Sequence, residues 1–501
     1  MKLRLSNIAA RLSDMPMVCV AAALAAGILL GVRWQLPVWF AAAALALCCA
    51  MSYLCNRRRA GVAYAAAAVV IAGMMLPVLH APAVNVPYGR RVVMRVEVLS
   101  EPAWRGDYAV AEGRITSWRD SGASRSADDK VRLWIGCDSV ACGDRLLIEA
   151  RLAERISRHA DYSRAMHRRG YVGAVSVSGT NILYKESGAA GTLQSAAVGR
   201  IRALGLSESG GAVVEAMTTG SRAGITPELR RSYSRSGAAH VLAMSGLHLG
   251  IAAMAVNLLL AWLSLLHRGH IVRNVAAVAV IWLFAVAGGL SPSIVRAAIM
   301  FSILQLSLAA SSSYSSLNAL AATVFLMLIF DSSYLFDTGF QLSVSAVAGI
   351  LLWGVPLCRR LRSGRRVVDA LVATLVVSWC ATLWTMPAVS HVFGYVSWVG
   401  TLISPAVMAT ATVIVAFGAL AIVLPEGWLA APLRFVLDNA ARLQNGVAEM
   451  FGKEWCAADW RMDTCQMIAV YALFAAITLV LWSVDRKKKV TLPDYDDFIR
   501  Y

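Results

Sequence analysis

Long apolar segments separated by short basic ones occupy most of this chain, and that pattern predicts membrane-spanning helices. A helix needs about 20 apolar residues to cross a bilayer core, and about ten segments approach that length. Three of them come first, near residues 16–33, 36–55 and 60–79. The first could be read as a signal peptide, but no small-residue cleavage site separates it from the second. We therefore interpret residues 1–85 as a three-helix membrane segment.

Residues 86–184 follow a different pattern, in which β-branched residues alternate with polar ones in short runs. Five such runs predict strands near 92–98, 108–115, 130–135, 145–152 and 171–177. Short strands separated by turns that contain Gly and Asp indicate a small β-barrel or sandwich. The next segment, 185–237, is mildly amphipathic and predicts an interfacial rather than a spanning structure.

A second membrane block fills residues 238–424. The apolar runs predict helices near 240–266, 274–290, 294–310, 315–330, 341–357 and 367–386. Lys and Arg gather in the cytoplasmic loops of membrane proteins. Counting crossings from a cytoplasmic N-terminus places residues 86–237 on the outer side. It also places the basic loops Arg268–Arg273 and Arg359–Arg366 inside, in agreement with that rule.

The stretch 392–424 breaks this count if it crosses once, because the basic residues Arg486–Lys489 would then lie outside. Pro405 falls within the stretch, and proline removes a helical hydrogen bond. We therefore predict a re-entrant hairpin at Pro405, an external amphipathic segment at 425–466, and a last helix with a cytoplasmic tail at 467–501. The fold class is a polytopic α-helical membrane protein with about ten transmembrane helices, a re-entrant hairpin and an external small β-barrel domain.

Composition supports membrane residence and says little about partners. The 501 residues are 58% hydrophobic and only 15% charged, against roughly 25% charged in soluble domains. The formal net charge is +17. Part of that excess is what basic cytoplasmic loops give any membrane protein, so it does not by itself indicate nucleic-acid binding.

Polar side chains open the apolar run near 240. His240, Ser245 and His248 lie there, and polar groups at membrane depth usually line a cavity or pair with one another. A pair of satisfied helix-end histidines is the simpler alternative. Ser245 and His248 are three residues apart and can touch on a helix. An intramembrane hydrolase is therefore a rival interpretation, although no Gly-x-Ser-x-Gly motif accompanies the pair.

The segment Gly237–Gly250, with His240, Ser245-Gly-Leu-His248 and Gly250, resembles the most recognisable motif of the ComEC family of competence proteins. Further matches occur in the family's order at Asp161–Gly173, Thr219–Arg222, Pro292–Ala297 (Pro-Ser-x-x-Arg-Ala) and Asp331–Ser343 (with Gly-Phe-Gln-Leu-Ser). Two positions depart from the family pattern. Ser221 stands where Asp is usual, and Gly400 replaces a common Asn.

The resemblance implies a channel that carries single-stranded DNA across the cytoplasmic (inner) membrane during natural transformation, with an OB-like outer domain. It implies transport rather than enzymatic activity, and no cofactor. The sequence contains neither a Walker motif nor the His-x-His-x-Asp-His cluster of the metallo-β-lactamase-like domain that many members carry. We therefore expect an ATP-driven helicase or translocase, an external DNA receptor or uptake pilus and a separate nuclease as partners. A homo-oligomer in the lipid bilayer is compatible with this interpretation, and a transporter for a small anion or a peptidoglycan intermediate is the other rival.

The candidate residues of the DNA path combine the polar residues of these motifs. They are His240, Ser245, His248, Arg296, Asp331, Asp337 and Gln341. The guanidinium of Arg296 can bind a phosphate through two parallel hydrogen bonds, or it can anchor a helix at the interface. Carboxylates repel phosphate, so we expect Asp331 and Asp337 to pair with Arg296 or His248, to bind a cation, or to serve as helix-end acids.

The outer domain is a second candidate for DNA contact, because single strands bind by stacking bases on aromatic side chains in a basic groove. The candidates are Trp104, Trp118, Arg168 and Arg169. Basic residues only slightly outnumber acidic ones there, and many aromatic residues of a small domain belong to its core.

Four cysteines lie in polar segments assigned to the outer side. Cys137 with Cys142, and Cys456 with Cys465, each flank a short loop that a disulfide could close in an oxidising compartment. Zinc is the alternative, but no histidine lies close to either pair, so we predict disulfides and no metal site.

Overall fold

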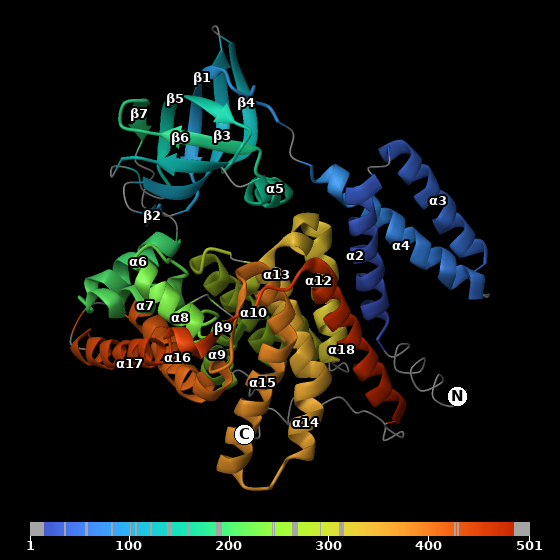
Figure 1. The fold of residues 1–501 in the computed structure, drawn as a ribbon, viewed down its shortest axis with the longest axis vertical. Coiled ribbons are helices and arrows are strands. Elements are labelled where there is room, and N and C mark those ends of the chain that lie inside the picture. The colour runs from blue at the N-terminus through green and yellow to red at the C-terminus, as the bar shows by residue number, and fades with distance from the viewer. Residues whose placement is uncertain are drawn as a thin grey trace.

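The computed structural model describes residues 15–484. Short gaps in this description fall at 35–36, 56–58, 82–83, 101, 106–107, 121–122, 138–139, 141–142, 158–159, 187–192, 243, 245, 263–268, 291, 310–314, 425–426 and 428–429. Figure 1 shows a sheet domain at one end of the molecule, a helical body below it and three N-terminal helices to one side.

The N-terminal helices are α2 (Pro16–Trp34), α3 (Val38–Leu54) and α4 (Arg59–Leu79). Helices α2 and α4 approach closely because glycines line their contact. A Cβ atom added to Gly27 would lie 2.1 Å from the carbonyl oxygen of Val70, and one added to Gly73 would lie 2.5 Å from that of Leu24. Small residues allow such close backbone approach between membrane helices. The predicted three-helix segment is therefore present.

The sheet domain contains seven strands and one helix. They are β1 (Arg91–Val98), β2 (Ala103–Arg105), β3 (Tyr108–Asp120), β4 (Ala123–Ile135), β5 (Arg145–Ala153), α5 (Ala160–Arg168), β6 (Gly173–Val177) and β7 (Ile182–Glu186). Alternate residues of β1 face inwards, as its period of two predicts. The sheet order is β1-β3-β4-β6-β5-β7, and β1 also pairs with β5. Five strands are thus linked in a ring, with β4 and β6 the parallel pair.

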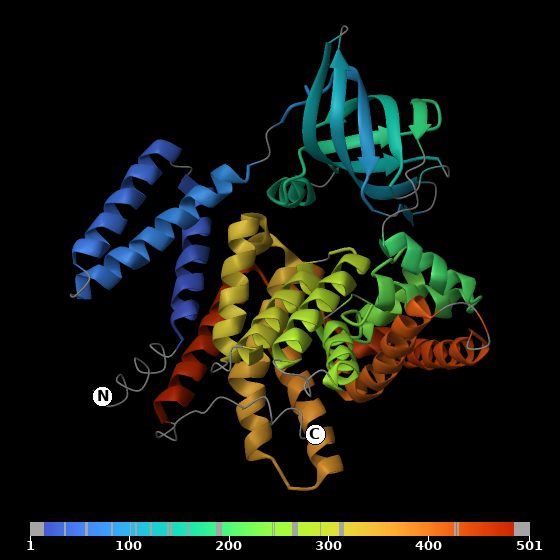
Figure 2. The same cartoon turned by 180° about the vertical axis from the view of Figure 1, so that it is seen from behind.

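Two parts of the chain that are distant in sequence form one helical core on the side of the body below the sheet domain (Figures 1 and 2). They are α6 (Leu193–Ala203), α7 (Glu208–Thr219) and α8 (Pro227–Arg235), together with α16 (Gly400–Val423) and α17 (Ala430–Met450). Nearly all of α7 is buried, because it packs against both α16 and α17. The segment that we interpreted as interfacial therefore contributes a core helix.

The remaining helices form the rest of the body. They are α9 (Gly246–Leu259), α10 (Gly269–Ala287), α11 (Pro292–Ala309), α12 (Ser316–Phe330), the 3-10 turn η2 (Ser332–Phe336), α13 (Thr338–Gly349), the π-helical η3 (Ile350–Gly354), α14 (Val355–Arg360), α15 (Arg366–Phe393), the 3-10 turn η4 (Glu454–Cys456) and α18 (Thr464–Val484). Among the described residues, six helices are long and apolar enough to cross a membrane and five apolar ones are shorter. The chain is a helical membrane protein with a separate sheet domain, and about ten crossings stays a prediction.

The re-entrant hairpin predicted at Pro405 is wrong. Helix α15 continues to Phe393, and α16 runs through Pro405 without interruption. Pro405 lies in the second turn of α16, where it costs a single backbone hydrogen bond. The hydroxyl of Ser404 donates to the carbonyl oxygen of Gly400 at 2.9 Å and adds a bond to the same turn.

The chain does turn back after α16, but the returning segment is helix α17 and not the second arm of a hairpin at Pro405. The chain enters α16 from β8 (Tyr395–Ser397) and leaves α17 through β9 (Ala457–Asp459). These two short strands pair antiparallel, with Tyr395 opposite Asp459. The pairing holds the end of α15 and the start of α18 together. Helix α18 then runs toward the end of the molecule where α14 connects to α15 (Figures 1 and 2).

Candidate functional site

Segments that carry the sequence motifs meet beside the start of α9. A Cβ atom added to Gly237 would lie 2.9 Å from the Cα of Gly400, and one added to Gly220 would lie 2.8 Å from the carbonyl oxygen of Gly288. The same Gly220 position lies 3.3 Å from the sulfur of Met244. Two close backbone contacts therefore join these regions of the chain in pairs, Gly237 with Gly400 and Gly220 with Gly288.

The histidine motif differs in shape from the predicted helix 240–266, because α9 begins only at Gly246. Gly237 adopts a positive φ of 79° and a tight turn follows it. His240 lies in that turn, where its side chain is exposed and its Nδ1 donates to the carbonyl oxygen of Gly237 at 3.0 Å. His248 lies in the first turn of α9 and is 1% exposed. Ser245 lies outside the described residues, so the Ser245–His248 pair stays a prediction.

Arg296 occupies the second turn of α11 and is 2% exposed. Its Nη2 donates to the side-chain oxygen of Ser293 at 3.0 Å and to the carbonyl oxygen of Ser293 at 3.3 Å. Its Nη1 has no hydrogen-bond partner within the part of the chain that the structure describes. A buried charged donor without a partner is costly. An anion beside Nη1 would satisfy this donor.

The acidic candidates cap the helices that surround Arg296. Asp331 begins η2 and accepts from the backbone N–H of Ser333 at 2.8 Å. Asp337 begins α13 and accepts from the backbone N–H of Phe340 at 2.9 Å. Gln341 donates to the carbonyl oxygen of Leu335 at 2.8 Å. These are the helix-end roles that the sequence left open, and no hydrogen bond joins either carboxylate to Arg296 among the described residues.

The sheet domain contacts the helical body at η2. Arg169 follows α5, and its Nη2 lies 2.6 Å from Oδ2 of Asp337. The guanidinium of Arg168 lies over the ring of Phe336, at 5.3 Å from the centroid. From the other side, Nδ1 of His80 accepts from the backbone N–H of Ser332 at 3.1 Å. Arg168 and Arg169, predicted to contact DNA, are therefore engaged between the two parts of the protein.

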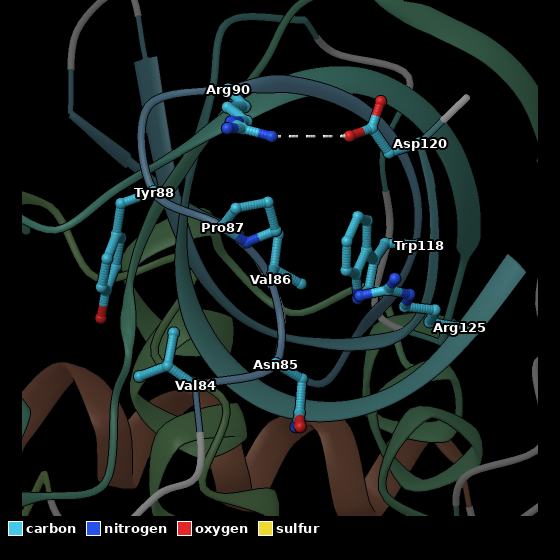
Figure 3. A pocket seen from close by; sticks show the side chains of 9 residues that line it. All are labelled: Val84, Asn85, Val86, Pro87, Tyr88, Arg90, Trp118, Asp120 and Arg125. Carbon is cyan, nitrogen blue, oxygen red and sulfur yellow. Dashed lines mark ion pairs between the residues drawn. The ribbon is translucent and has the colours of Figure 1, made fainter. Parts of the chain in front are cut away.

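Trp118, an aromatic candidate of the sheet domain, is also less available than predicted. Trp118 is 6% exposed within the core of the sheet domain, and Arg125 lies 5.3 Å above its ring. Trp104 lies in β2, and its side chain falls outside the described residues. Trp118 and Arg125 border a pocket of about 640 Å³ beside the segment 84–90 (Figure 3). Figure 3 also shows the Arg90–Asp120 ion pair at the rim of this pocket.

Sequence reasoning missed Asp129, which fixes the segment that leads into the sheet domain. Its carboxylate is fully buried and accepts from the backbone N–H of Val86 at 3.1 Å. It also accepts from the backbone and side-chain nitrogens of Asn85 at 3.0 and 2.9 Å. A carboxylate in a polar run of β4 was the only signal. Its partners lie in another part of the chain, so the sequence could not identify the role.

The predicted disulfide between Cys456 and Cys465 is not present among the described residues. Cys456 is fully buried in the core that α16 and α17 share, whereas Cys465 is exposed at the start of α18, and both are free thiols. One sulfur faces the core and the other the surface, so the pair does not meet. Cys137 is also a free cysteine, and Cys142 lies outside the described residues. Among the described residues, no group of His, Cys, Asp and Glu could hold a metal ion.

The model of the competence protein family matches residues 217–487, more than half of the chain. The chain belongs to this family, the ComEC-type competence proteins. It is similar to ComE operon protein 3 of Bacillus subtilis (strain 168), with 27% identity over 184 residues. That alignment covers 36% of this chain and 22% of the relative, so the chain matches less than a quarter of the relative's length. No solved structure matches. The family match includes His248, Arg296 and Asp337, and it begins after the sheet domain ends.

Proposed function

We propose that this competence protein forms a path for single-stranded DNA across the cytoplasmic membrane during natural transformation, with Arg296 as a phosphate-binding residue of the path. The observation that carries the proposal is the buried guanidinium whose Nη1 has no partner among the described residues. A DNA strand presents one phosphate per nucleotide. A phosphate that enters a region of low dielectric loses hydration, and a hydrogen bond to a charged donor offsets roughly 1.5–3 kcal/mol of that loss.

The proposed orientation places the sheet domain on the outer side and both termini in the cytoplasm. Two observations support it. The sheet domain and the connection between α14 and α15 lie at opposite ends of the molecule (Figure 1). That connection carries the basic cluster Arg359–Arg366, which the positive-inside rule assigns to the cytoplasm. The pairing of β8 with β9 brings the end of α15 to the start of α18, so these two helices run in opposite senses, which supports a cytoplasmic C-terminus.

The sheet domain is proposed to be an OB-like barrel that receives the strand before the helices do. The ring of pairings through β1, β3, β4, β6 and β5 supports that interpretation. Base stacking needs exposed aromatic faces. Tyr108 is 40% exposed and packs against Trp134, so it suits stacking better than Trp118, which is buried under Arg125.

Because no nucleotide-binding motif occurs in the sequence, the path itself is passive. An ATP-driven helicase or translocase in the cytoplasm would pull the strand. An external receptor or pilus would deliver DNA, and a separate nuclease would supply single strands. His240 and His248 are proposed to contribute hydrogen bonds beside Arg296. Their contribution is binding and not chemistry.

The test compares Arg296→Ala with Arg235→Ala, scored for labelled DNA in the cytoplasm and, separately, for DNA taken up to the outer side. Arg235 is an exposed arginine paired with Glu454 at 3.3 Å, so its loss controls for removal of a positive charge. We expect Arg296→Ala to abolish cytoplasmic arrival at normal protein abundance and outer uptake. Arg296→Lys should restore it only in part, because lysine lacks the planar fork. Normal DNA arrival in Arg296→Ala would reject the proposal. Transport of phosphate or another small anion by vesicles holding the protein, without DNA entry, would favour the small-anion transporter.

A further inference from the structure

Asp337 is held by partners on both of its carboxylate oxygens. Oδ1 accepts from the backbone N–H of Phe340, which makes Asp337 the N-cap of α13. Oδ2 lies 2.6 Å from Nη2 of Arg169, which comes from the end of α5 in the sheet domain. The side chain of Asp337 is only 15% exposed. Bonds of this kind between charged groups, largely shielded from water, are the stronger ones.

Arg296 is the other cation beside this carboxylate. Asp337 lies close enough to Arg296 to influence it electrostatically, and helices α11 and α13 are in contact. No ion pair joins the two side chains within the described part of the chain. The nitrogen Nη1 of Arg296 keeps no partner there, although a carboxylate is close by. The position of Arg169 explains this arrangement, because it occupies the oxygen that Asp337 would otherwise offer to Arg296.

We propose that Arg169 is a positioning residue of the DNA path: by holding Asp337 it keeps the carboxylate away from Arg296 and leaves that guanidinium available to a phosphate. The inference rests on the proposed function of Arg296. Without Arg169, Asp337 keeps its capping bond but has a free oxygen in a poorly solvated site. Arg296 is a cation beside that oxygen, and an ion pair between them would compete directly with phosphate.

Docking of the sheet domain is thereby linked to the state of the phosphate site. Arg168 over Phe336 and His80 beside Ser332 hold η2 next to Asp337 from two directions. With the sheet domain docked, Arg169 faces Asp337 and Arg296 is free to bind. With the sheet domain displaced, Asp337 turns to Arg296 and the site closes to phosphate.

A double-mutant cycle separates this role from simple docking. The variants are Arg169→Ala, Asp337→Asn and the combination, scored in the whole protein for cytoplasmic DNA arrival, outer uptake and abundance. Asparagine caps a helix as well as aspartate does but cannot form an ion pair with Arg296. We expect Arg169→Ala to reduce DNA arrival roughly tenfold or more, the size of a lost charged hydrogen bond. In the Asp337→Asn background, the same Arg169→Ala change should have little further effect, and the double variant should import clearly more DNA than Arg169→Ala alone.

Arg168→Ala is the matched control, since it weakens docking at Phe336 but leaves the pair between Arg169 and Asp337 in place. If Arg169 acted only by docking, Arg168→Ala would be equally harmful and Asp337→Asn would not suppress the Arg169→Ala defect. Either result overturns the inference, as would wild-type DNA arrival in Arg169→Ala. If the proposed function of Arg296 were itself wrong, the Arg296→Ala variant would import DNA normally. That result distinguishes failure of the proposed function from failure of the inference on Arg169.

Discussion

Gly237 and Gly400 touch backbone to backbone, 163 positions apart in the printed sequence: a Cβ atom on Gly237 would lie 2.9 Å from the Cα of Gly400. Gly237 also has a φ of 79°, a conformation that disfavours any residue with a side chain. The contact joins the turn that holds His240 to the first residue of α16. Gly400 is also where the chain departs from its family's usual Asn. In this protein the absence of a side chain at 400 is what allows the two segments to touch.

Gly237→Ala should therefore lower both protein abundance and DNA arrival, because strain and a backbone clash act together and cost roughly 1–3 kcal/mol. Gly400→Ala is the milder partner, since its Cβ would lie 3.2 Å from the Cα of Gly237 in a helix that accepts alanine. The readouts are abundance in the membrane and thermal aggregation of the purified protein. Equal tolerance of both changes would show that the contact is loose.

The association of α2 with α4 should depend on Gly27. Leucine at this position would drive a side chain into the backbone of α4, where even a Cβ atom would lie 2.1 Å from the oxygen of Val70. We expect Gly27→Leu to abolish crosslinking between cysteines introduced at the interface. Ala26→Leu is the control, because Ala26 is exposed on the adjacent face of α2. Crosslinking that survives Gly27→Leu would contradict the described packing.

Acid should weaken the sheet domain through Glu112. Burial alone would raise the pKa of this carboxyl, but the charge of Lys130, a hydrogen bond from Tyr171 and the charge of Arg132 together lower the pKa below its ordinary value of 4.5. A lowered pKa in the folded state means that the ionised carboxylate stabilises the fold above pH 4.5. That contribution is lost as the pH falls through the folded-state pKa.

Glu112→Gln should accordingly speed hydrogen exchange in β3 and β4 at pH 7, and the difference from the unchanged protein should vanish at a pH well below 4.5. The expected loss is up to about 1 kcal/mol, because the ion pairs to Lys130 and Arg132 are partly exposed and screened by water. If the difference in hydrogen exchange persisted unchanged at acid pH, the effect would come from packing and not from the charge of Glu112. Glu97→Gln, at a more distant pair with Arg145 (3.9 Å), is a matched control.

Asp129 should be needed to fix the entry to the sheet domain. Asp129→Ala leaves the backbone N–H groups of Asn85 and Val86 without their acceptor, and bonds to a charged group contribute about 1.5–3 kcal/mol. We expect limited proteolysis to cut near residues 81–90 in this variant and not in the unchanged protein. Asp128→Ala serves as the control, since Asp128 is exposed and pairs with Arg114 at 3.4 Å. A protease-resistant Asp129→Ala protein would show that Val86 is held by its apolar contacts alone.

The apolar pattern predicted most of the helices because length and hydropathy decide them locally. The prediction of a helix near 315–330 is confirmed by α12, and the one near 60–79 by α4. The start of α9 was harder to predict. The apolar run begins before His240, but the positive φ of Gly237 and the turn after it delay the helix to Gly246. The periodicity of the apolar residues does not indicate a turn of this kind.

The five predicted strands were in place, but those that became β3 and β4 were too short, and β2 and β7 were not predicted. β3 and β4 continue as a long hairpin in which Ser117 pairs with Ser126. Apart from the buried Trp118, the residues of this extension are mostly polar, so apolar alternation gives little signal for them. Pro405 produced the opposite error. A proline within an apolar run suggests a break, yet its position in the second turn of α16 is tolerated.

The candidate site contains an ion pair, between Arg169 and Asp337, that the sequence could not predict. Residue type and motif selected Arg296 and Asp337, and the structure brings the helices that carry them, α11 and α13, into contact. The partner of Asp337 could not be chosen among the many arginines of the chain, because charge alone does not specify distance. The structure selects Arg169, a residue from the other domain.

Because Tyr395 pairs with Asp459, the chain enters α16 and leaves α17 at the same place. A segment that leaves and rejoins the chain at the same point can lengthen, shorten or change in sequence without inverting whatever follows it. The direction of α18 is therefore independent of how α16 and α17 lie in the bilayer. Changes in α16 and α17 must preserve their packing on α7, but they need not alter the direction of the helices on either side.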